Sequence, residues 1–387
     1  MVATSAVALL EALQVQHPGL GEYFSRFADL YQRKMWHQLT LLLEEAIALP
    51  EFQAGDLLVQ LYASFVSDFA YKINLLQLAH IVTAVAKRYG DLGAAAAFIE
   101  GEAAKLKEQK LPRSEQPVLY LAMQVAQYHL QMGEVTKCRD AVAEGKAALD
   151  AIDDVDPSVS ASVHYVSSQY HKHAKNFAEF YKSSLLYLAY VSSDVLPAEY
   201  KVSLAVDISL AALLGENVYS FGELLQHPII NALEGTPYAW LREFIHCFNA
   251  GDLHRYDELC TQHAAVLNAQ PALVENERFL REKITIMSLL ALIFSLPSEN
   301  RIIALQTIAD RAKLSLDGVE FLLMKTMSKH LIEGVIDQVD GSVAVSWVQP
   351  CVLTMPQISE LKARLGGWIG KVDGATLVLE EEAVGVE

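Results

Sequence analysis

Two histidines of this chain, His171 and His173, have the spacing that most invites a metal-site interpretation. In zinc-dependent isopeptidases a pair of this kind works with an aspartate that would fall at position 184, where this chain has Ser184. If the segment is helical, residues two apart point to different faces of the helix. The sequence therefore predicts an ordinary pair of surface histidines and no metal site.

The chain also lacks the motifs of common nucleotide-binding and hydrolytic sites. There is no GxxxxGK loop, no GxGxxG that opens a helix after a strand, and no GxSxG. Four cysteines, Cys138, Cys247, Cys260 and Cys351, are scattered without CxxC spacing, which argues against disulfides and structural zinc and fits a reducing compartment. His246 adjoins Cys247 but would face elsewhere on a helix. We therefore predict a protein that is not an enzyme and uses no cofactor.

The composition is that of a globular, acidic protein. Of 387 residues, 52% are hydrophobic, so the chain can bury a large core, and its length allows roughly two or three domains. The N-terminus has no basic leader and does not resemble a signal peptide. The longest nearly apolar stretch, residues 284–297, is too short to span a bilayer. These features predict a soluble intracellular protein that does not associate with membranes.

Residues 3–295 show almost uninterrupted helical periodicity. Helices joined by short connections pack antiparallel to their neighbours, and a long series of such pairs forms a right-handed solenoid. Segments 133–150 and 176–191 resemble degenerate tetratricopeptide units. We assign residues 1–214 to a mainly α helical-repeat arm. The periodicity predicts helices at residues 20–31, 36–49, 56–69, 75–89, 93–106, 116–132, 135–152, 159–173, 178–192 and 199–214.

Residues 300–350 predict a winged helix, which would complete a module that spans residues 215–350 and has a helical part at 215–299. Two short helices come first, and Ser315 is the expected N-cap of the second. After Gly334 the periodicity becomes that of strands, with Asp340-Gly341 as the turn of a two-stranded hairpin and Pro350 as its end. The apolar residues of these elements are Leu305, Ile308, Ala309, Ala312, Val319, Leu322, Leu323, Met327, Val343, Val345 and Trp347.

Charge decides whether this winged helix would bind nucleic acid. Groove binding needs cations on the second helix, because phosphate neutralisation supplies most of the affinity. The second helix begins with Asp317 and Glu320, and the hairpin tip carries Asp337 and Asp340. The whole chain has a formal net charge of -17. The sequence therefore predicts a winged helix that packs against protein and binds no nucleic acid.

Residues 351–387 predict a last helix, at about 356–372, and an acidic tail. The apolar residues of the helix are spaced three and four apart, as in a coiled coil, and such a narrow stripe needs a partner to bury it. The alternative is that the helix folds back on its own domain. The stripe consists of Ile358, Leu361, Leu365, Trp368 and Val372. The glutamates at 380–382 and 387 are expected to be solvated and mobile.

This order of helical arm, winged helix and terminal helix resembles the PCI module, named for the proteasome, the signalosome and a translation initiation factor. The winged helix carries Val319-Glu320-x-Leu322-Leu323, followed by Leu331-Ile332-x-Gly334-x-Ile336-Asp337. Over residues 23–372 the chain is similar to PCI-domain subunits of the lid of the 26S proteasome regulatory particle. That similarity is carried by Leu30-Tyr31, Lys34-Met35-Trp36-His37-Gln38-Leu39-Thr40, Leu213-Leu214-Gly215-Glu216, Phe221-Gly222-Glu223-Leu224-Leu225-x-His227-Pro228 and Trp347-Val348-Gln349-Pro350.

The resemblance implies structural work without chemistry. PCI subunits of the lid set their winged helices side by side and gather their C-terminal helices in a bundle that nucleates assembly. It implies a hetero-oligomeric scaffold in cytoplasm and nucleus, with PCI and MPN-domain subunits as partners, that supports ATP- and ubiquitin-dependent protein degradation. We expect interfaces at the terminal stripe and at an exposed hairpin edge formed by Val343, Val345 and Trp347. The alternatives are a PCI scaffold of the signalosome or of an initiation factor, and a PCI protein that binds nucleic acid.

Overall fold

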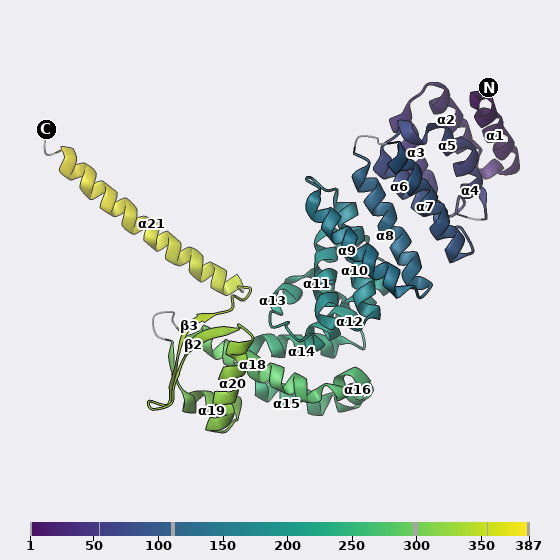
Figure 1. Ribbon diagram of the computed structural model, residues 1–387. Coiled ribbons are helices and arrows are strands. Elements are labelled where there is room, and N and C mark those ends of the chain that lie inside the picture. The colour runs from purple at the N-terminus through teal and green to yellow at the C-terminus, as the bar shows by residue number, and fades with distance from the viewer. Residues whose placement is uncertain (1, 54, 110–112, 297–300, 354, 385–387) are drawn as a thin grey trace. The chain divides into compact units, whose positions relative to one another are not determined.

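The computed structural model describes residues 2–53, 55–109, 113–296, 301–353 and 355–384, and these are mainly helical with one small sheet (Figure 1). The prediction of a mainly α chain with a small sheet near its C-terminal end is confirmed. The chain forms two compact units, residues 1–195 and 196–387. Helix α12 (Ala198–Leu214) packs on η5, α14 and α18 of the second unit. The division therefore lies one helix before the boundary that we placed at residue 214.

The first unit is a stack of helices in which neighbours along the chain pack against each other (Figure 1). Every helix that the periodicity predicted in this unit is present. The largest departure is at residues 56–69, where the π-helical turn η2 interrupts the α-helix. The elements are α1 (Val2–Gln16), η1 (Pro18–Leu20), α2 (Gly21–Gln32), α3 (Trp36–Ala48), α4 (Leu57–Leu61), η2 (Tyr62–Val66), α5 (Ser67–Phe69), η3 (Ala70–Lys72), α6 (Leu75–Ala86), α7 (Leu92–Glu108), α8 (Glu115–Gln131), α9 (Val135–Ala151), α10 (Pro157–His173), α11 (Phe177–Tyr190) and η4 (Ser193–Val195).

Aromatic rings form the core at the N-terminal end of this unit. Phe24, Phe27, Phe52 and Phe65 are all almost completely buried. The ring centroids of Phe24 and Phe52 lie 5.7 Å apart, and those of Phe27 and Phe65 lie 6.1 Å apart. Inclined ring pairs of this kind add about 0.5–1.5 kcal/mol each to the gain from burial. Because the rings come from α2, η2 and the loop before α4, their packing holds these three segments together.

Short polar side chains fix where several of these helices begin. The side-chain oxygens of Asn74, Asp91 and Asp156 each accept a hydrogen bond of 2.9 Å from a backbone N–H in the first turn of α6, α7 and α10. Each cap satisfies a donor that the helix cannot satisfy itself, and its loss costs about 1 kcal/mol. The caps therefore stabilise the short connections that the repeat architecture requires.

The second unit continues with short helices, a winged helix and a long terminal helix. Helices α17 and α18 are separated at Asn276, whose Nδ2 donates to the Ala272 carbonyl at 2.8 Å. None of the described helices has the length and apolarity that a membrane span needs. The remaining elements are α13 (Gly222–Gln226), η5 (Pro228–Leu233), α14 (Ala239–Ala250), α15 (Leu253–Gln262), α16 (Ala264–Asn268), α17 (Pro271–Glu275), α18 (Glu277–Ser295), β1 (Ile302–Ala304), α19 (Leu305–Ala312), α20 (Leu316–Ser328), β2 (Ile332–Asp337), β3 (Ser342–Val348) and α21 (Met355–Val384).

The winged helix has the predicted helices and hairpin, and it also has a third strand. The Ser315 hydroxyl accepts from the Gly318 N–H at 3.3 Å, which confirms it as the N-cap of α20. The sheet order is β1-β3-β2, and both pairs are antiparallel. We predicted only two strands, because β1 has three residues and too little alternation to be recognised. Its partner lies far along the chain, with Ile303 opposite Val343.

Lys283 is an ionisable residue in the core of the second unit, with 1% of its surface exposed. Its Nζ lies 2.7, 3.1 and 2.8 Å from the carbonyl oxygens of Ala212, Leu213 and Gly215, at the C-terminal end of α12. Three aromatic rings lie 5.3–5.7 Å from the same nitrogen. Those carbonyls have no partner within their own helix, so Lys283 on α18 caps α12 and joins the two helices.

Gly251 ends α14 in the left-handed region, with φ +64°. A Cβ at this position would lie 2.7 Å from both the Met287 carbonyl oxygen and the Ser288 Cα on α18. We expect G251A to lower the free energy of unfolding by about 2–4 kcal/mol, because backbone strain and overpacking add. The matched control is G235A, where φ is +72° and no atom lies within 4 Å of the new Cβ, so that strain alone costs about 1–2 kcal/mol. Equal losses in urea denaturation would mean that α14 does not need this close approach to α18.

Candidate assembly surfaces

The histidine pair that invites a metal-site interpretation lies on α10. His171 and His173 lie in the last turn of α10, and Ser184 is fully buried in α11. Burial lowers the pKa of His171 below its usual value, which keeps this imidazole neutral at pH 7. Within the described residues, no group of three or more His, Cys, Asp or Glu could hold a metal ion.

The four cysteines are all free thiols. Burial raises the pKa of Cys138 to about 11 and that of Cys247 to about 12. Both groups are therefore protonated at neutral pH and are weak nucleophiles. The Cys247 thiol donates a hydrogen bond of 3.1 Å to the Asp252 carbonyl. This bond links α14 to the turn that follows it.

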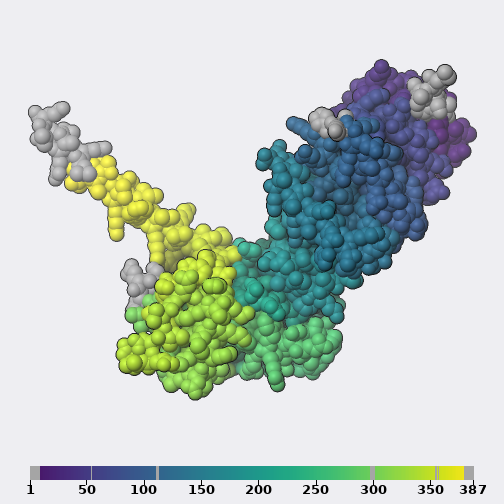
Figure 2. Space-filling model, viewed as in Figure 1, coloured from purple at the N-terminus to yellow at the C-terminus, as the bar shows by residue number. Residues whose placement is uncertain are grey.

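The terminal helix α21 is the main exposed apolar surface that the sequence predicted. All described side chains between Gln357 and Val378 are exposed (Figure 2). The five stripe residues are 43–65% exposed. The helix also extends to Val384, well beyond the predicted end at Val372, so the glutamates at 380–382 are helical rather than part of an irregular tail. Glu387 lies outside the described residues.

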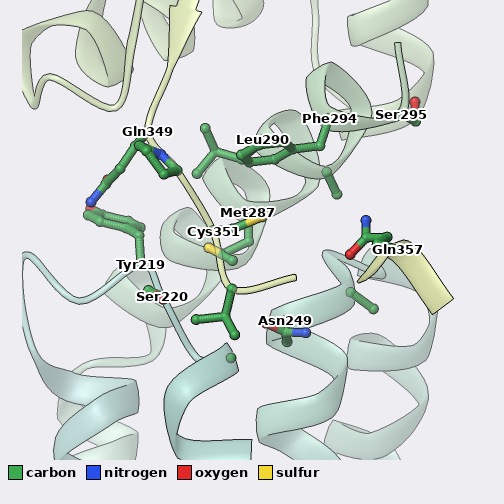
Figure 3. A pocket seen from close by; sticks show the side chains of 15 residues that line it. Tyr219, Ser220, Asn249, Met287, Leu290, Phe294, Ser295, Gln349, Cys351 and Gln357 are labelled. Carbon is green, nitrogen blue, oxygen red and sulfur yellow. The ribbon is translucent and has the colours of Figure 1, made fainter. Parts of the chain in front are cut away.

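A short extended segment anchors the start of α21 to the second unit. A Cβ on Gly222 would lie 2.6 Å from the Val352 Cβ, so this glycine is what lets Val352 approach α13. The Gln226 Nε2 donates to the Leu353 carbonyl at 3.1 Å. Beside this contact is a pocket of about 440 Å³, into which Cys351 and Met287 point (Figure 3). The anchor fixes where the free helix leaves the folded module.

The prediction that Val343, Val345 and Trp347 lie on an exposed hairpin edge is wrong about the edge. These residues belong to β3, the central strand, and Val343 and Val345 are 0% and 6% exposed because they face the helices. Among the described strands, β1 and β2 each pair only with β3, so each has an open side. On β2, Val335 is 71% exposed, and Trp347 of β3, which lies opposite Glu333, is 40% exposed. The sheet therefore has two open backbone edges, and that of β2, with six residues, is longer than that of β1, with three.

Gly334 of β2 has a structural reason to be glycine. The register of β2 against β3 shifts between Glu333 and Gly334, which marks a β-bulge. A Cβ on Gly334 would collide with the Ala344 carbonyl oxygen. The Gly-x-Ile-Asp pattern therefore marks a bulged strand, and the Asp337 carboxylate then accepts from the N–H groups of Val339 and Asp340 in the hairpin turn.

Two family models match the chain, the PSD13 N-terminal repeats over residues 23–245 and the PCI domain over residues 260–347. The 26S proteasome non-ATPase regulatory subunit 13 homolog B of Arabidopsis thaliana is 52% identical over 378 residues, which cover 98% of each chain. The chain belongs to the family of 26S proteasome non-ATPase regulatory subunit 13. The member from Dictyostelium discoideum is 35% identical over 99% of each chain, and the Saccharomyces cerevisiae subunit RPN9 is 32% identical over 94% of each chain.

Membership in the subunit 13 family confirms the predicted PCI domain and the role of a regulatory subunit in the proteasome lid. It also confirms that the chain is not an enzyme, since the family consists of non-ATPase regulatory subunits. Subunit M of the eukaryotic translation initiation factor 3 of Aspergillus fumigatus is 26% identical over only 46% of this chain. The initiation-factor alternative is therefore weaker than the proteasomal assignment.

Three features of the site were missed from the sequence. Strand β1 was missed, and with it the central position of β3 in the sheet. The anchor at Val352 carries no recognisable pattern, although the neighbouring Gly222 was part of a stretch that supported the resemblance. The apolar surface of α20 around Phe321, which is 63% exposed, was taken only as part of an amphipathic helix.

Proposed function

We propose that this subunit is a scaffold whose terminal helix α21 docks into a bundle with helices of other lid subunits. The observation that carries the proposal is the exposure of the stripe on a helix that follows a domain with a complete core of its own. Fully burying one large apolar side chain gains about 1.5–3 kcal/mol. Five half-exposed side chains would therefore gain about 5 kcal/mol in a bundle.

The open edge of β2 would supply a second contact. Unpaired backbone groups on a strand edge accept a strand or loop from a neighbour, and the exposed Val335 and Trp347 would add apolar contact beside that edge. PCI-domain and MPN-domain subunits of the lid are the partners that we propose for these surfaces. The subunit would then hold other components in place during ubiquitin-dependent degradation, in cytoplasm and nucleus.

Truncation after Leu353 tests this proposal. It removes α21 but keeps the contact of Val352 with Gly222 and the hydrogen bond from Gln226, so the winged helix should stay folded. We expect the tagged full chain to recover the lid from cell extract, and the truncated chain to recover at most a tenth as much. Circular dichroism of the purified proteins controls for folding. Equal recovery by both chains would show that α21 is not the assembly element.

A further inference from the structure

A groove in the second unit, outside the surfaces described above, runs between α18 and the α19–α20 pair. It has a volume of about 410 Å³. Its apolar lining includes Leu314, Leu322 and Phe321. Phe321 is 63% exposed, and Met324, one turn further along α20, is 55% exposed. Two large side chains this exposed on a folded helix are typical of a contact surface.

The groove is cationic although the chain is strongly acidic. Its lining contains four basic residues, Arg278, Arg281, Lys313 and Lys325, and two carboxylates. The acidic residues of α20 named above, Asp317 and Glu320, are not among the residues that line it. The groove therefore carries two more positive than negative side chains, in a chain whose formal net charge is -17.

The ion pairs within the groove leave positive charge available. Asp257 is shared between Arg281 at 3.5 Å and Lys313 at 3.4 Å, and both cationic side chains are more than half exposed. Lys325 is paired with Glu282 at 2.6 Å. No described carboxylate lies within ion-pair distance of Arg278. Exposed pairs of this length contribute little, so a carboxylate from outside can bind without a large loss.

We propose that this groove binds an acidic amphipathic helix of another protein chain. The apolar face of that helix would lie on Phe321 and Leu314, and its carboxylates would meet Arg278 and Arg281. The complementarity of charge selects the partner, because the rest of this acidic chain repels the same peptide. Nucleic acid is disfavoured, since the exposed face of α20 presents Phe321 and Met324 where a groove-reading helix needs cations.

The test uses the full chain and two labelled synthetic peptides of equal length. One is an amphipathic helix of leucine, alanine and glutamate, and the other has lysine in place of every glutamate. We expect fluorescence anisotropy to show at least about tenfold tighter binding of the acidic peptide, with an affinity that falls as salt rises. Preference for the lysine peptide would overturn the proposal, because it would mean that the overall charge of -17 dominates.

Substitutions locate the binding. R278E combined with R281E should weaken the acidic peptide about tenfold or more, and F321A should weaken it about fivefold. All three side chains are outside the core, so circular dichroism should be unchanged. The matched control reverses two cations outside the groove, K362E with R364E on α21, and should leave the affinity unchanged.

Two other results would contradict the proposal, one about where the peptide binds and one about which class of ligand the groove accepts. If L361S with L365S on α21 abolishes peptide binding while the groove variants do not, the peptide binds the terminal stripe and the proposal fails. If a duplex oligonucleotide competes as well as the unlabelled acidic peptide, the groove is a general anion site and not a surface for an amphipathic helix. Neither result bears on membership in the lid, which recovery of lid subunits measures separately.

Discussion

Replacing Lys283 by methionine should lower the free energy of unfolding of the second unit by about 3–5 kcal/mol. Methionine retains the length and the apolar stem, but it leaves the carbonyls of Ala212 and Leu213 without their donor, and the Gly215 carbonyl keeps only the Val218 N–H. A buried carbonyl that loses its partner costs about 1–3 kcal/mol. The contacts of the ammonium group with the rings of Tyr219 and Phe221 are lost as well.

Urea denaturation of the full chain measures this loss, and hydrogen exchange should localise it to the amides of α12 and α18. The matched control is K362M on the exposed face of α21, which should change stability by less than about 0.5 kcal/mol. If K283M unfolds at the same urea concentration as the unmodified chain, Lys283 does not hold α12 to α18.

The stability of this unit should also depend on pH through Lys283. Burial, with the nearby charge of Lys329, lowers the pKa of Lys283 from 10.5 to about 7 in the folded state. Between these two values the unfolded chain binds more protons at this site than the folded chain, so stability rises with pH by up to about 1.4 kcal/mol per unit. The unmodified chain should therefore gain stability relative to K283M between pH 7 and 8.5. An unchanged difference across that range would contradict the shift.

The helices and the hairpin could be predicted because local periodicity determines them. Residues such as Leu305, Ile308 and Ala312 recur at helical spacing, and the structure buries all three. The alternation around Val343 and Val345 likewise predicted a strand at β3, but we expected both residues on an exposed edge and the structure buries them. Alternation says nothing about which strands pair, so the central position of β3 depended on a partner forty residues away that the sequence did not reveal.

The structure also differs from the sequence-based expectation at Lys283 and at the end of α21, because residue type and local pattern do not reveal tertiary contacts. The sequence gives no sign that Lys283 is buried, because lysine is almost never fully buried unless it is paired. Its partners are carbonyls at the end of another helix, which no sequence pattern marks. We predicted that α21 ends near Val372, where the apolar stripe ends. Glycine within a helix costs only about 1 kcal/mol, and the helix continues to Val384.

The second large effect should come from the stripe of α21. This helix contains Gly366, Gly367, Gly370 and Gly374, each of which weakens it by about 1 kcal/mol relative to alanine. A helix with four glycines and no core of its own gains most of its stability from packing against a partner. Serine at stripe positions removes that packing without adding charge. We therefore expect L361S, L365S and W368S together to reduce incorporation into the lid about tenfold or more.

The matched control places three serines on other faces of the same helix, E360S, A363S and K371S. These changes have a similar effect on helix propensity and leave the stripe intact. Both variants should have the same circular dichroism spectrum as the unmodified chain, because all six side chains are exposed.

The decisive measurement expresses each tagged variant in cells that also contain the untagged chain, so that the two compete for the lid. The lid is then purified, and the amount of tagged variant is measured relative to another lid subunit. The account predicts that the control variant is incorporated as well as the unmodified chain, while the stripe variant is largely excluded. Equal incorporation of the stripe variant would contradict the claim that this subunit joins the lid through α21.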